Sequence, residues 1–106
     1  MPRRLHKESI IKDFNENGLH QKAVTDTKRD LNGGSLVMLS IFTTLDTSGQ
    51  LAYITEVLDR CTDIDMDIDT VELHVSFGSE LQSIMERAVF SYLLSLAKNN
   101  PQFTTS

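Results

Sequence analysis

Apolar residues recur at helical spacing in three parts of the chain. These segments span residues 7–17, 48–61 and about 79–98. The second and third segments each open with a capping box, in which Thr47 is answered by Gln50 and Ser79 by Gln82. Pro101 follows the last segment and prevents its continuation as a helix. The pattern therefore predicts a short N-terminal helix and two capped helices, of which the C-terminal one is long.

Between the first two of these helices the pattern indicates extended structure. The dipeptide Asn32-Gly33 tolerates positive φ, which is typical of the turn of a short hairpin. We therefore predict a β-hairpin that pairs residues 23–31 with residues 36–44. The second of these segments is apolar at both even and odd positions, which suits a central strand and also a buried helix. An alternative in which residues 35–46 are helical therefore stays open.

Alternation of apolar and polar residues predicts a strand over 71–77. The alternation has the opposite phase over 63–68, so an irregular or edge strand is expected there. Combined with the helices and the hairpin, these strands predict an α+β fold. The alternative fold is an all-α dimer.

Composition supports one small domain. The chain has 106 residues, 40% of them hydrophobic, with one cysteine and a net charge of −5. We expect a single domain over 1–106 whose ends, 1–5 and 101–106, are flexible tails. No apolar run is long enough to span a membrane and no secretory signal follows Met1. A lone cysteine makes no internal disulfide, so a reducing, cytoplasmic location is expected.

The acidic charge is concentrated in one short run. Residues 1–30 carry seven bases and five acids, whereas 31–106 carry three bases and ten acids. Four carboxylates alternate along one stretch and would share one face of an extended strand: Asp63, Asp65, Asp67 and Asp69. The run lacks the glycine and glutamate of an EF-hand loop, so we predict no metal site. It suits a solvated strand edge or a docking surface for a basic protein partner.

The C-terminal helix has more apolar surface than one face can bury. From Ala88 to Ala97 it is apolar nearly all round, with Phe90 and Leu94 opposite the main stripe. Either the N-terminal helix folds back over these two residues or they pair with a second copy. We predict a homodimer interface made by Phe90, Tyr92, Leu93, Leu94 and Leu96.

Few residues suggest chemistry of another kind. Glu72 and His74 share the outward side of the predicted strand over 71–77, without a predicted pocket or nucleophile, so catalysis is not favoured. A basic N-terminal segment offers possible phosphate contacts through Arg3, Arg4 and Lys7, although an acidic body repels nucleic acid. No cofactor, metal or catalytic residue is predicted.

Three functions remain possible from the sequence. The first is a small acidic, non-enzymatic regulatory protein, homodimeric and bound to a protein partner through its acidic face. The second is a nucleic-acid-binding regulator that uses the basic N-terminal segment. The third is a ligand- or metal-binding enzyme. The first agrees best with the uneven charge, the excess apolar surface and the absence of a catalytic motif.

Overall fold

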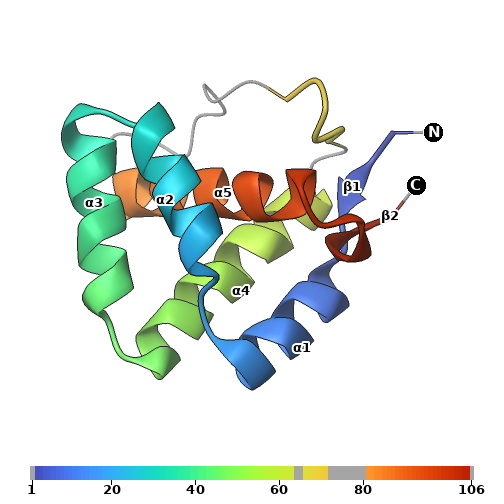
Figure 1. Ribbon diagram of the computed structural model, residues 1–106, viewed down its shortest axis with the longest axis horizontal. Helices are drawn as coiled ribbons and strands as arrows, with labels where there is room; N and C mark the ends of the chain where they lie inside the picture. The colour runs from blue at the N-terminus through green and yellow to red at the C-terminus, as the bar shows by residue number, and fades with distance from the viewer. Residues whose placement is uncertain (1, 64–65, 72–80, 106) are drawn as a thin grey trace.

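The last helix lies at the centre of the fold, and three of the other helices pack against it (Figure 1). The computed structural model describes residues 2–63, 66–71 and 81–105. These residues form helices with the bounds Lys7–Asn17 (α1), Gln21–Asp30 (α2), Gly33–Thr44 (α3), Thr47–Asp63 (α4) and Leu81–Lys98 (α5). Helices α2, α3 and α4 all pack against α5, while α1 packs against α4.

The described residues make an all-α fold, so the predicted α+β class is wrong. Strands in this part of the chain are limited to β1 (Arg4–Leu5) and β2 (Thr104–Thr105), two residues each. The helices predicted over 7–17 and 48–61 are present, as is the long C-terminal helix from Leu81 onwards. The predicted hairpin is replaced by α2 and α3.

Helix α2 forms because its few apolar residues are spaced for a helix, not for a strand. Ala23, Val24 and Thr27 are buried, and Thr27 lies one turn after Ala23 and Val24 on the same side of the helix. The Thr27 hydroxyl donates a hydrogen bond to the Ala23 carbonyl over 2.7 Å, which satisfies this polar group inside the core. The positive φ of Gly33, +59°, is used to connect two helices, not two strands.

The apolar run that could form either a strand or a helix is the helix α3, Gly33–Thr44. This is the alternative in which residues 35–46 are helical. Leu39 and Phe42 are fully buried at a spacing of three residues. An apolar run of this length fits both structures, and β-branched residues favoured the strand. Packing against α5 outweighs that preference.

The start of α4 is capped one residue earlier than the sequence indicates. The Asp46 carboxylate accepts the Gly49 backbone N–H over 2.7 Å, which is the bond of an N-cap residue. The Gln50 amide instead donates to the carbonyls of Phe42 and Thr43, over 3.3 and 3.2 Å. Gln50 therefore holds the end of α3 against α4, and Asp46 replaces Thr47 as the cap.

Two short segments near the ends of the chain pair with each other, within the ranges 1–5 and 101–106 for which tails are predicted. Arg4 pairs with Thr105 and Leu5 with Thr104 in the antiparallel sheet β1–β2. Between α5 and β2, a 3₁₀ helix (η1, Pro101–Phe103) inserts the buried ring of Phe103 into the core.

Candidate functional site

The acidic run does not form one strand face in the part that the structure describes. Asp67 and Asp69 lie in a turn after α4, where the Asp67 carboxylate accepts the Asp69 backbone N–H over 3.1 Å. Asp69 also pairs with Arg3 over 3.0 Å. The intervening Ile68 is buried and bonded to the Arg3 carbonyl. The edge strand predicted over 63–68 is therefore wrong for residues 66–68.

The structure does not describe the side chains of the other two aspartates of the run. Asp63 is the last residue of α4, and Asp65 lies outside the described residues. Docking of a partner by these four residues stays a prediction. Its geometric basis, a row of carboxylates on one extended face, does not hold for Asp67 and Asp69.

The five residues predicted to make the dimer interface lie inside the chain. Helices α2, α3 and α4 pack against α5 (Figure 1), and the large apolar residue left exposed on it is Leu81, in its first turn. At most 4% of each side chain is exposed, for Phe90, Tyr92, Leu93, Leu94 and Leu96. A dimer formed through these residues would require the domain to open. The homodimer interface stays a prediction, on residues that are buried within the chain.

Two of the three predicted phosphate contacts are engaged within the chain. The Arg3 guanidinium bonds to Asp69 and to the Ala97 carbonyl, over 3.0 and 3.3 Å. Lys7 pairs with Asp59 of α4. Arg4 is exposed on β1. The basic N-terminal segment thus ties β1 and α1 to the rest of the fold, which reduces the charge available to a nucleic acid.

The chemistry proposed for Glu72 and His74 falls outside the described residues. Within them, no group of three or more His, Cys, Asp or Glu side chains could hold a metal ion. No described helix is both long and apolar enough to cross a bilayer.

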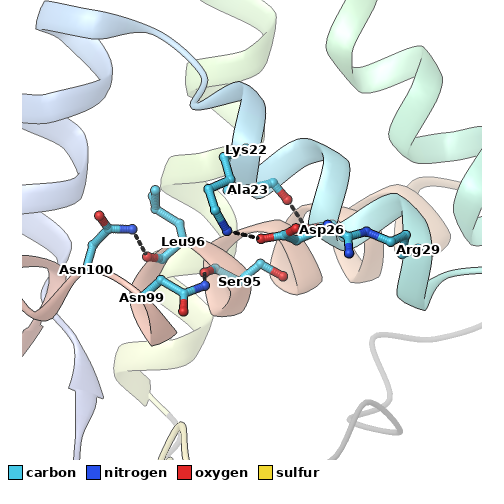
Figure 2. Close-up of polar contacts among 9 residues, drawn as sticks. Lys22, Ala23, Asp26, Arg29, Ser95, Leu96, Asn99 and Asn100 are labelled. Carbon is cyan, nitrogen blue, oxygen red and sulfur yellow. Dashed lines mark hydrogen bonds and ion pairs between the residues drawn. The ribbon is translucent and has the colours of Figure 1, made fainter.

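A shallow polar hollow lies between the first turns of α2 and the last turn of α5. Figure 2 shows Lys22 reaching Asp26, whose other oxygen binds Arg29. The hydrogen bond from Lys22 lowers the pKa of Asp26. On the facing helix the Asn99 and Asn100 amides donate back to α5 carbonyls, the latter over 2.6 Å. These contacts stabilise the helix ends and occupy the groups that a ligand would need.

His20 lines the same hollow, and its ring is held in place. Its Nε2 donates to Asp13 over 2.6 Å, its backbone N–H donates to the Tyr92 hydroxyl over 3.0 Å, and its ring meets the edge of Phe103. The pair Asp13–His20 connects the α1–α2 junction to α5 and η1.

Helix α3 has an exposed, uncharged face that does not pack into the core. Val37 is 56% exposed and Ile41 is 41% exposed, one helical turn apart. With Leu36, Ser40 and Thr44 they line one shallow hollow, and we call these five residues the α3 face. None of the twelve residues of α3 is charged. A surface helix normally turns charged side chains to solvent, so this face is exceptional in the described structure.

The polar atoms on the α3 face have partners within the helix. The Ser40 hydroxyl donates to the Leu36 carbonyl over 3.2 Å, and the Thr44 hydroxyl to the Ile41 carbonyl over 2.7 Å. Covering these hydroxyls would therefore leave no donor unsatisfied. The α3 face presents methyl groups to the exterior and behaves as an apolar surface.

The outer side of α4 carries a comparable hollow but a different chemistry. It includes Glu56, Asp59 and Arg60, which already form ion pairs along the surface. Such charged groups are costly to cover, because each loses its water. The α3 face has no such penalty, so it is the better docking surface of the two.

A buried carboxylate beneath α4 was missed by the sequence reasoning. Glu86 of α5 is 1% exposed, and its Oε2 lies 2.6 Å from Nη1 of Arg60. Arg60 also bonds Glu56, so one guanidinium joins an internal and an external carboxylate. The available signal was the one acid of α5, which lies two residues before the stretch 88–97 that is apolar nearly all round.

Comparison with known proteins identifies no relative. No family model matches the chain, no curated protein matches it, and no solved structure matches its fold. Function therefore has to be argued from the surfaces described above.

Proposed function

We propose that the chain is a non-enzymatic protein-interaction domain that docks on another protein surface through the α3 face. The observation that carries the proposal is the exposure of Val37 and Ile41 on a helix without a single charge. Single exposed apolar residues are ordinary, but a continuous uncharged ridge supports a docking role. Anchors at positions i and i+4 are the arrangement by which a helix packs on a partner.

The other described surfaces favour this function less. The polar hollow at His20 is occupied by bonds of the chain to itself, and the basic residues Arg3 and Lys7 are paired with acids. A regulatory role remains compatible with the net charge of −5, which discourages indiscriminate association. The single, half-buried thiol of Cys61 supports a reducing location such as the cytoplasm.

The test compares capture by wild type with capture by a variant of the α3 face. The double substitution Val37→Glu with Ile41→Glu places two carboxylates in the docking surface, where binding would remove their water. Both positions are exposed and glutamate is a good helix former, so the variant should fold. We expect wild type to retain a specific protein from a native extract, untagged copies of the chain included, and the variant to lose it.

The matched control adds the same charge elsewhere. Thr25→Glu with Ala52→Glu places two carboxylates on exposed positions of α2 and α4. This control should capture the same protein as wild type. If the α3 variant captures it equally well, or if nothing specific is captured by wild type, the proposed function is wrong.

A further inference from the structure

Two Asn-Gly pairs occur in the chain, Asn17-Gly18 and Asn32-Gly33. In such a pair the backbone nitrogen of the glycine can attack the asparagine side chain, because glycine has no Cβ to obstruct the approach. We propose that Asn32 is a site of spontaneous covalent modification by water, which converts it to aspartate and isoaspartate, and that the native fold protects Asn17 from the same reaction.

The reaction at Asn32 proceeds through a succinimide ring and consumes one water. The Gly33 backbone nitrogen loses its proton to solvent and its electron pair forms a bond to Cγ of Asn32. The bond from Cγ to the side-chain nitrogen breaks, and this nitrogen takes a proton from solvent and leaves as ammonia. Water then opens the ring. Addition at Cγ gives aspartate, and addition at the backbone carbonyl carbon gives isoaspartate, in which the chain continues through Cγ. Nothing is oxidised or reduced, and the product gains one negative charge.

The attacking nitrogen of Gly33 is available in the native fold. Gly33 is the first residue of α3, and the first N–H groups of a helix have no acceptor within it. Among the described residues, no backbone carbonyl outside the helix accepts this N–H either. A Cβ placed on Gly33 would meet no atom within 4 Å, so space is open on this side of the pair.

The side chain of Asn32 is equally unrestrained. Asn32 is exposed, has an extended backbone with φ −142° and ψ 170°, and makes no capping hydrogen bond from its side chain. The helix that follows it opens with two exposed glycines, Gly33 and Gly34. Glycine is a poor helix former, so opening of this first turn costs little free energy and lets the nitrogen reach Cγ.

The pair Asn17-Gly18 has the same two residue types, but both reacting groups are held. Asn17 is the last residue of α1, and its side-chain amide donates to the Asp13 carboxylate over 2.9 Å. The Gly18 N–H donates to the carbonyl of the buried Phe14 over 2.8 Å. Attack requires both hydrogen bonds to break, so we expect ring closure to be slower here than at Asn32.

The two products change the start of α3 in different ways. Aspartate is as good an N-cap residue as asparagine, and its charge lies at the positive end of the helix. Isoaspartate inserts an additional carbon atom into the backbone before Gly33, which displaces the first turn. Either product adds one negative charge to the net −5, next to a helix that carries no charged residue.

Peptide mapping of the purified full chain tests the proposal, because trypsin places the two pairs in different peptides, 13–22 and 30–60. The chain is incubated in mildly alkaline buffer, folded or unfolded in urea, and digested at intervals. Deamidation makes a peptide about 1 Da heavier, and electron-transfer fragmentation locates the change and distinguishes isoaspartate from aspartate. In the folded chain, we expect Asn32 to convert at least roughly 10-fold faster than Asn17. In urea, the two should convert at similar rates.

The matched control is Asn32→Gln, which keeps the amide but needs a larger, less favourable ring. Its peptide 30–60 should keep its mass, while Asn17 behaves as in wild type. Equal rates at the two pairs in the folded chain, or faster conversion of Asn17, would overturn the proposal. So would an Asn32 that stays unmodified in the folded chain while the unfolded chain converts. A difference of the same size that persists in urea would show that local sequence protects Asn17, and would overturn the role given to the fold.

Discussion

At the scale of single residues, the buried carboxylate of Glu86 has an ion-pair partner in Arg60 among the described residues. Arg60 of α4 contacts it over 2.6 Å, and the arginine side chain is itself 41% exposed. A buried charge that loses its partner is strongly destabilising, whereas removing both charges together can be neutral. This pair therefore links α4 to α5 more strongly than the surface ion pairs do.

We predict that Arg60→Ala lowers the free energy of unfolding by about 3 kcal/mol, measured by urea denaturation. Glu56→Gln removes the exposed partner of the same arginine and should cost less than about 0.5 kcal/mol. Arg60→Leu combined with Glu86→Leu should recover most of the loss. Equal costs for Arg60→Ala and Glu56→Gln would show that Glu86 does not depend on this pair.

The single thiol gives a second prediction at this scale. Burial raises the pKa of Cys61 to about 12 from its ordinary 9.0. At a pH of about 8 the thiolate fraction is then roughly a thousandfold lower than in the unfolded chain. Alkylation by iodoacetamide, followed by mass spectrometry, should be slower by that order in the native protein than in urea. Similar rates in the two states would be inconsistent with a desolvated thiol.

At the scale of elements, the cap of α4 shows how far local sequence is informative. The segment Thr47–Gln50 matches a capping box, and the helix does begin there. The Asp46 carboxylate nevertheless makes the capping bond, and Gln50 turns to the end of α3. Two adjacent residues could each cap this helix, and the packing of α3 on α4 selects between them.

We therefore predict that Asp46→Ala destabilises the protein by about 1 kcal/mol. Thr47→Ala should change the stability by less than about 0.5 kcal/mol, because the structure assigns no capping bond to its hydroxyl. Thermal denaturation of the two variants makes the comparison. A larger cost for Thr47→Ala would return the cap to the position that the sequence indicates.

Helices with a clear period were predictable, and the short apolar run was not. Residues 7–17 and the long C-terminal segment each contain an apolar stripe at helical spacing, which favours a helix. Residues 36–44 are apolar at nearly every position, so their own pattern cannot distinguish a helix from a strand. The arrangement of α3 against α5 decides it, and that contact lies far from the run in sequence.

At the scale of the whole molecule, the exposed apolar surface lies elsewhere than the sequence predicts. The sequence located the excess apolar surface on α5, because Phe90 and Leu94 lie opposite its main stripe. Periodicity describes one helix and says nothing about how many neighbours surround it. Helices α2, α3 and α4 pack against α5, and Phe90 and Leu94 are buried. Among the described residues, the exposed large apolar side chains are Val37 and Ile41 on α3 and Leu81 at the start of α5.

The closure of the chain ends also belongs to this scale. Phe103 is 2% exposed, and its 3₁₀ turn leads into the strand that pairs with β1. We predict that Phe103→Ala lowers the free energy of unfolding by about 3 to 5 kcal/mol, measured by denaturant titration. A loss below about 1 kcal/mol would mean that the C-terminal segment contributes little to the folded domain.

The central claim is that the α3 face receives another protein surface. Capture from a native extract by wild type and by Val37→Glu with Ile41→Glu tests this contact most directly. The account predicts a specific captured protein that the variant loses and that Thr25→Glu with Ala52→Glu retains. Equal capture by wild type and the α3 variant, or no specific capture by wild type, would contradict it.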